Sequence, residues 1–135
     1  MQSYWPTVLT NPEASPRALK LARWVENVSK IVFSKTLSRA EWKNSRLVKD
    51  HIAEEISALK QQPGLDLMIF GSPRLTHTFI HLGLIDEYRL FLNPIVLGGG
   101  IPLFQGIKDW TKLKLLEAKT FQAGVVGLHY QSIKP

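Results

Sequence analysis

The order in which apolar residues recur along this chain limits what it can fold into. Residues 30–34 and 67–70 are short apolar runs of strand length. Apolar residues at helical spacing surround these runs, in segments that begin near Pro16, Asp50 and Pro73. Helices that alternate with buried strands favour parallel strands joined by crossovers, so we predict an α/β fold.

The second half of the chain has a different pattern. Residues 86–97 alternate like one long strand, and the glycines 98–100 interrupt it. Residues 113–119 and 125–131 have the pattern of two further strands joined by a short turn, which favours antiparallel pairing. We therefore expect a single domain over residues 1–135, with a mixed, mostly parallel sheet that helices flank and that ends in antiparallel strands.

Local signals mark the helix ends. Ser15 and Pro16 combine a capping hydroxyl with a first-turn proline, and Gly83 predicts the stop of the helix that begins near Pro73. Residues 1–14 lack a periodic pattern, and we expect them to be irregular.

Composition excludes several classes of protein. The 135 residues are 44% hydrophobic and 21% charged, as in an ordinary globular domain, and they include no cysteine. Disulfides, thiolate catalysis and cysteine-based zinc sites are therefore excluded, which fits a reducing compartment. The N-terminal residues do not resemble a signal peptide, and no apolar stretch approaches the length of a membrane span. We expect a cytoplasmic protein that does not bind a membrane.

The net charge of +6 comes from basic residues interspersed with acidic ones. This pattern predicts either an ordinary basic surface or a groove for an anionic small molecule, and it does not indicate a nucleic acid partner.

The most informative candidate site follows residues 67–70. A strand that passes through a glycine directly into a helix exposes the backbone N–H groups of the helix N-terminus, which attract an anion. Ser72 can cap the helix or bind a phosphate oxygen, and Arg74 adds positive charge. The alternative is a plain strand-to-helix turn, because the full dinucleotide fingerprint is absent. The candidate cofactor-binding residues here are Phe70, Gly71, Ser72, Pro73 and Leu75.

A second candidate site comprises Ser34, Lys35 and Thr36, directly after residues 30–34. Ligands of open sheets bind beyond the carboxyl ends of parallel strands. If residues 31–34 and 67–70 are parallel strands, both candidate sites lie on one rim, and Ser34 and Lys35 can hold a second phosphate. The alternative is a solvent-exposed turn.

Other polar and glycine positions are weaker candidates. Gly98 and Gly99 can let a ring or ribose of the substrate lie against the backbone, or they form a flexible turn. The adjacent acids Asp86 and Glu87 are either an acid/base group or a solvated or lysine-paired loop. No catalytic residue is assigned.

His77 and His81 lie opposite the apolar face of the predicted helix. We expect them to be solvated or at a contact surface, and we expect no metal site.

Several blocks of the sequence together resemble dihydrofolate-reductase-like proteins related to the C-terminal reductase domain of riboflavin biosynthesis deaminase-reductases. These blocks are Ile31–Leu37, Met68–Ser72, Ile85–Glu87 followed by Pro94 and Leu97–Phe104, and the final strand from Gly124 to Gln131. The resemblance implies a dihydrofolate-reductase-like fold, NADPH as hydride donor and a homodimer.

The resemblance also implies roles for residues. It places the cofactor pyrophosphate at Gly71 and Ser72, and the adenosine 2′-phosphate near Ser34 and Lys35. The implied substrate is a small molecule, either a pterin or a ribosylaminopyrimidine.

The family's opening "SLDG" strand and "GRxTYE" helix start have no counterpart in this sequence, and residues 1–6 resemble the tail of that helix. We therefore expect a form that lacks the family's N-terminal segment, which supplies much of the substrate and nicotinamide pocket.

Three functions are compatible with these observations: an NADPH-dependent reductase, a non-catalytic nucleotide-binding domain of the same fold, and an unrelated interaction module that uses Tyr4 and Trp5. A dihydrofolate-reductase-like fold would exclude the last.

Overall fold

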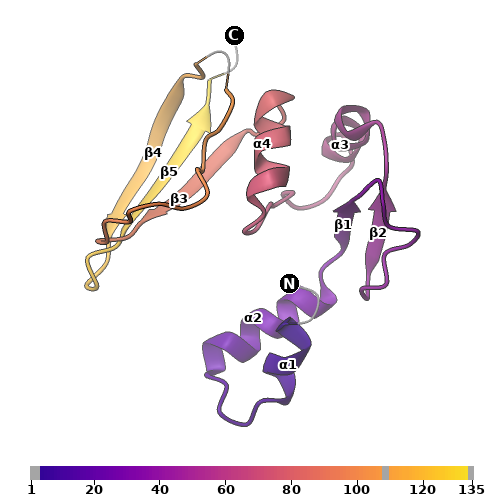
Figure 1. Cartoon of the computed structure of the whole chain (residues 1–135), viewed down its shortest axis with the longest axis horizontal. Helices are drawn as coiled ribbons and strands as arrows, with labels where there is room; N and C mark the ends of the chain where they lie inside the picture. The colour runs from indigo at the N-terminus through magenta and orange to yellow at the C-terminus, as the bar shows by residue number, and fades with distance from the viewer. Residues whose placement is uncertain (1–3, 108–109, 134–135) are drawn as a thin grey trace. The chain divides into compact units, whose positions relative to one another are not determined.

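The computed structural model describes residues 4–107 and 110–133. The chain forms two compact units, residues 1–54 and residues 55–135. The described residues form four helices and five strands, which are labelled in Figure 1. Helix α3 (Ile52–Lys60) contains the boundary between the two units.

The first unit combines two helices with a parallel pair of strands. Its elements are α1 (Tyr4–Thr10), α2 (Pro16–Asn27), β1 (Lys30–Phe33) and β2 (Ser45–Val48). Strands β1 and β2 pair in parallel, with Lys30 opposite Ser45 and Phe33 opposite Val48. The Ser34 amide extends this ladder by donating to the Val48 carbonyl at 3.1 Å. Strand β1 was expected over residues 30–34, and its parallel pairing agrees with the parallel strands predicted for this half of the chain, although its partner is β2.

Helix α1 differs from the expectation that residues 1–14 are irregular. Val8 of α1 is buried, as are Ala22 and Val25 of α2. A helix of seven residues with one buried side chain is too short to show periodicity. Its helical state therefore depends on tertiary packing, which a local pattern does not reveal.

Helix α2 is capped at both ends. The Ser15 hydroxyl accepts a hydrogen bond from the Ala18 amide at 3.2 Å, as the sequence predicts. At the other end, the Lys30 ammonium donates to the carbonyls of Val25 at 2.8 Å, Glu26 at 3.2 Å and Val28 at 2.7 Å. A cation at this position stabilises the partial negative charge of the helix C-terminus.

The second unit contains α4 (Pro73–His81) and an antiparallel sheet. Its strands are β3 (Glu87–Leu92), β4 (Leu113–Thr120) and β5 (Val126–Ser132), in the order β3-β5-β4. Figure 1 shows β5 between its two neighbours. The antiparallel ending of the fold is confirmed, and β3 is shorter than the strand predicted over residues 86–97.

The strand predicted over residues 67–70 is wrong, because these residues form no strand in the structure. Leu67 is 46% exposed, Met68 61% and Phe70 47%. Apolar side chains favour a strand only where a neighbouring strand pairs with its backbone and buries its faces. Strand β1 takes β2 as its partner instead, so parallel pairing among the described residues is confined to the separate two-stranded sheet of β1 and β2.

No helix of residues 4–107 and 110–133 is both long enough and apolar enough to cross a membrane.

Candidate functional site

The start of α4 has the backbone geometry that an anion-binding turn requires. Gly71 adopts a left-handed conformation with φ of +63°, which other residues rarely adopt. A Cβ atom at Gly71 would have no neighbour within 4 Å, so the backbone conformation and not crowding calls for glycine. The chain can therefore turn directly into α4, with space beside the backbone for a ligand.

The Ser72 side chain is free to bind a ligand at this helix start. Ser72 occupies the N-cap position, and its hydroxyl makes no capping hydrogen bond. Its carbonyl accepts from the Thr76 amide and the Thr76 hydroxyl, both at 2.9 Å, which anchors the first turn. The first-turn amides of Arg74 and Leu75 lack intrahelical acceptors. The interpretation of Ser72 as a helix cap is therefore not supported, whereas a hydroxyl and two amides remain available.

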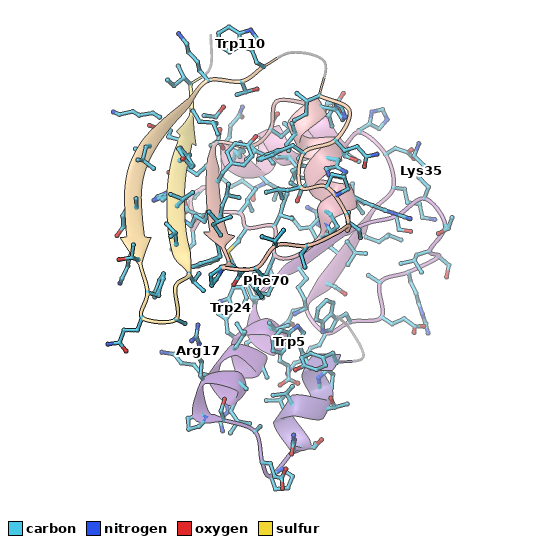
Figure 2. The ribbon with its side chains drawn as sticks, turned by 60° about the vertical axis from the view of Figure 1, so that its left-hand side comes forward. Trp5, Arg17, Trp24, Lys35, Phe70 and Trp110 are labelled. Atoms are coloured by element: carbon cyan, nitrogen blue, oxygen red, sulfur yellow. The ribbon has the colours of Figure 1, made fainter. Side chains whose placement is uncertain are left out.

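The turn after β1 is organised by Ser34. The Ser34 hydroxyl oxygen accepts from the Thr36 amide at 3.3 Å and the Leu37 amide at 3.2 Å. Lys35 lies in this turn with an exposed side chain (Figure 2), for which the described residues provide no ion-pair partner. Ser34 thus holds the turn, and the Lys35 ammonium is available to an anionic ligand.

The predicted site residues divide between the two units. Ser34, Lys35 and Thr36 share one turn of the first unit, whereas residues 70–75 and the glycines 98–100 belong to the second. The prediction of a common rim required a strand at residues 67–70, and that strand is not formed.

A polar contact that the sequence did not reveal joins α4 to the segment that contains the three glycines, residues 98–107, which we call the triple-glycine loop. His77 Nε2 lies 3.0 Å from the carbonyl oxygens of both Pro102 and Leu103. One turn further along α4, the His81 ring lies beside Gly106. Of the two alternatives expected for these histidines, His77 contacts another segment of the chain, whereas His81 is exposed. No sequence signal identifies the partner of His77, because its acceptors are backbone atoms.

The adjacent acids Asp86 and Glu87 are both engaged in ion pairs. Asp86 pairs with Lys60, which also donates to the Leu84 carbonyl at 2.7 Å, so the alternative of a lysine partner is confirmed. Glu87 bonds His129 at 2.8 Å across β3 and β5. That hydrogen bond is the main reason why the pKa of Glu87 lies below its usual value.

The three glycines 98–100 are unconstrained by packing. A Cβ atom built on any of them would meet nothing within 4 Å. Close packing within the chain therefore does not require glycine at these positions. The absence of neighbours is compatible with a flexible turn and with a place for a ligand.

The described residues contain no group of three or more His, Asp or Glu side chains that could hold a metal ion. Trp5 is half-buried beside α2 (Figure 2). Tyr4 is 60% exposed.

A protein-family model, the RibD C-terminal domain, matches residues 1–127. The chain belongs to this family. YyaP of Bacillus subtilis (strain 168) is 37% identical to it over 126 residues, which are 93% of this chain and 66% of YyaP. YwjB of the same organism is 42% identical over 72 residues, which are 53% of this chain and 41% of YwjB. The chain thus spans just under two-thirds of YyaP's length.

Solved structures with low sequence identity share the family's fold. A putative riboflavin biosynthesis protein from Shewanella sp. PV-4 matches with a TM-score of 0.71 at 20% identity, over 96% of this chain and 87% of the other. A pyrimidine reductase-like protein from Corynebacterium diphtheriae matches with a TM-score of 0.60 at 17% identity, over 78% of this chain and 50% of the other. The fold is dihydrofolate-reductase-like, which excludes the unrelated interaction module.

Proposed function

We propose that the chain is an NADPH-dependent reductase domain. It would transfer hydride to a small heterocyclic or sugar-imine substrate, as dihydrofolate reductase and the riboflavin-pathway 5-amino-6-(5-phosphoribosylamino)uracil reductase do. The observation that carries the proposal is the start of α4, where the Ser72 hydroxyl makes no capping bond although it occupies the N-cap position. Membership of the RibD C-terminal domain family supports the same reaction class.

Each of the two units has residues that suit one phosphate group of this cofactor. A pyrophosphate is stabilised by free amides at a helix N-terminus and by a hydroxyl donor, which Arg74, Leu75 and Ser72 provide. A 2′-phosphate requires a cation that is not already neutralised, and Lys35 meets that requirement. Bound NADPH would supply the hydride, and the protein would supply position and electrostatics.

Two finer details of the proposal come from the family resemblance, a role in riboflavin biosynthesis and a homodimeric state. Two others come from the sequence itself, a cytoplasmic location and Gly98 and Gly99 as substrate contacts.

A specific observation favours a second candidate, a nucleotide-binding domain that does not catalyse. Reduction of an imine needs a proton donor as well as a hydride. Asp86 is already ion-paired with Lys60, and the hydrogen bond from His129 lowers the pKa of Glu87, which favours its ionised form. Turnover of any reducible pterin or aminopyrimidine would exclude this candidate.

Titration with NADPH and with NADH, followed by tryptophan fluorescence, tests the cofactor. We expect saturable binding that favours NADPH. Lys35→Ala should weaken NADPH binding about tenfold and NADH binding much less, because the charge-assisted contact to the 2′-phosphate is lost. Lys20→Ala, at an exposed position of α2, is the matched control.

Gly71→Val tests the helix start in the same assay. Valine cannot readily adopt φ of +63°, so the turn must change and NADPH binding should fall at least about tenfold. Gly64→Val is the control, because that position has neither a positive φ nor a crowded Cβ. Circular dichroism confirms that each variant is folded. A folded wild-type chain that does not bind NADPH would contradict the proposal.

A further inference from the structure

The triple-glycine loop has few contacts that hold it in place. Residues 98–107 contain no helix or strand, and all of them are exposed. The contacts described for the loop are the hydrogen bond from His77, the ring of Phe104 edge-on to Tyr88 at 6.1 Å, and Gly106 beside His81. Of these, only the His77 contact is a hydrogen bond, so it is the contact that specifies a backbone position.

His77 also fixes where the loop lies along α4. His77 is four positions after Pro73. At the helical rise of about 1.5 Å per residue, the distance between them along the helix axis is about 6 Å. The acceptors Pro102 and Leu103 are therefore held about one turn from the helix N-terminus. Gly99 is three residues before Pro102 and can reach about 10 Å from it, because an extended chain spans up to about 3.5 Å per residue.

We propose that His77 is a positioning residue that holds the triple-glycine loop beside the first half of α4. The backbone of Gly98 and Gly99 then covers the cofactor where it continues beyond the Ser72 phosphate site. This inference rests on the proposed function, because it takes the ligand at Ser72 to be NADPH. It assigns a role to a histidine that neither binds a metal nor contacts the ligand.

The chemistry of the contact suits a positioning role. A single imidazole N–H serves two adjacent carbonyl oxygens, so one side chain fixes two consecutive peptide groups. Both loop carbonyls belong to residues that are themselves exposed, and nothing else described for them sets their direction. Loss of the N–H would free the loop without removing a buried side chain from the core.

The glycines are compatible with a covering backbone. Nothing within the chain crowds Gly98 or Gly99, so their bare backbone leaves space for a ribose or ring. The contact from His77 to Pro102 and Leu103 holds the loop that contains these glycines against α4, the helix whose N-terminus forms the phosphate site. Without it, the three glycines would be free to move away from α4.

The test compares His77→Leu, which removes the donor, with His77→Gln, which keeps an N–H donor at similar length. Two ligands are titrated: NADPH, and adenosine 2′,5′-bisphosphate, which lacks the nicotinamide half. We expect His77→Leu to weaken NADPH binding about fivefold to tenfold and to change bisphosphate binding less than about twofold. His77→Gln should restore most of the NADPH affinity. A merely structural role would weaken both ligands together.

Limited proteolysis with chymotrypsin, which can cut after Leu103 and Phe104, gives a readout independent of the cofactor. Without ligand, His77→Leu should be cut in residues 98–107 several times faster than wild type. Thr78→Val, whose hydroxyl bonds the Arg74 carbonyl of its own helix, is the control and should not be cut faster. An unchanged cleavage rate in His77→Leu would overturn the proposal.

The two proposals fail in different ways. Wild-type NADPH binding that His77→Leu leaves intact would overturn the positioning role alone. A folded wild-type chain that fails to bind NADPH would overturn the proposed function and the covering role with it.

Discussion

Glu87 is held ionised by its surroundings on the antiparallel sheet. His129 bonds its carboxylate across the β3–β5 pair, and Arg89 lies 3.7 Å from the same oxygen. The hydrogen bond from His129 is the largest cause of the lowered pKa, and the charges of His129 and Arg89 add to it, whereas desolvation acts in the opposite direction. A carboxylate that accepts these contacts is suited to fixing the sheet, not to donating a proton.

The lowered pKa of Glu87 predicts the pH dependence of stability. Because the pKa is lower in the folded state than the ordinary 4.5, the stabilisation is present above about pH 4.5 and is lost as the pH falls through the folded-state value. Glu87→Gln should therefore melt below wild type at pH 6, and the difference should shrink towards pH 3. Thermal melts across this range measure it.

Glu117→Gln is the control for that experiment. Glu117 is exposed on the neighbouring strand β4 and has no ion pair among the residues of the structure that are described. Its substitution removes one carboxylate from the sheet without removing an ion pair, so it measures the effect of the charge change alone. A constant difference between Glu87→Gln and wild type from pH 6 to pH 3 would contradict the assigned cause.

At the scale of elements, α2 depends on a lysine that lies outside it. Lys30 is the first residue of β1, and its ammonium bonds three carbonyls at the end of α2 while lying 5.0 Å from the Trp42 ring centre. Desolvation lowers its pKa, the charge of Glu26 opposes that change, and Lys43 adds to it. One side chain thus joins the helix, the strand and the turn before β2.

Lys30→Met should lower the free energy of unfolding by about 1–2 kcal/mol, because the stem is kept and the carbonyl contacts are lost. Denaturant unfolding followed by circular dichroism measures the change. Lys20→Met, at an exposed position of α2, should change stability by less than about 0.5 kcal/mol. Equal effects of the two substitutions would show that the carbonyl contacts of Lys30 contribute nothing.

Helices with start or stop residues in their own sequence were predictable. Ser15 and Pro16 predict the start of α2, and the left-handed Gly83 lies just beyond the end of α4, as its sequence position suggests. Residues 67–70 were not predictable, because apolar composition indicates a need for burial without naming a partner strand. The short helix α1 was missed because it has one buried side chain.

In the candidate site, too, features that depend on local residues were predictable, and contacts between distant residues were not. The helix start at Gly71 and Ser72 was predictable, because glycine permits a left-handed turn and Pro73 fixes the backbone φ of the first helical turn. The contact from His77 to Pro102 and Leu103 was not, since it joins residues about 25 positions apart through carbonyl groups that every sequence contains. The partnership of Glu87 with His129 required the β3–β5 register.

At the scale of the whole molecule, an exposed edge of the antiparallel sheet could form the interface of the proposed homodimer. Strand β4 forms one edge of the antiparallel sheet, and seven of its eight residues are exposed. A long, exposed edge strand is a template for pairing with another chain. We therefore expect light scattering at tens of micromolar protein to give a mass near twice 15.3 kDa.

Leu116→Lys tests whether this edge is used. Leu116 lies at the register shift of β4 and is 43% exposed, so a charge there opposes pairing with a second copy. The variant should be monomeric, whereas Thr111→Lys, which lies before the strand, should remain dimeric. A dimer that tolerates Leu116→Lys would place the interface elsewhere.

The order β3-β5-β4 has a consequence for synthesis on the ribosome. Strand β3 pairs with β5 and not with β4, so Glu87 finds its partner Gln131 only after 44 further residues have been made. At a translation rate of about 5–20 residues per second, about 2–9 s pass between the synthesis of β3 and that of its partner β5. During that interval the backbone N–H and C=O groups of β3 lack the partners that β5 supplies, so they are open to pairing with other nascent chains. Translation speed between β3 and β5 therefore sets how long this segment is at risk of aggregation.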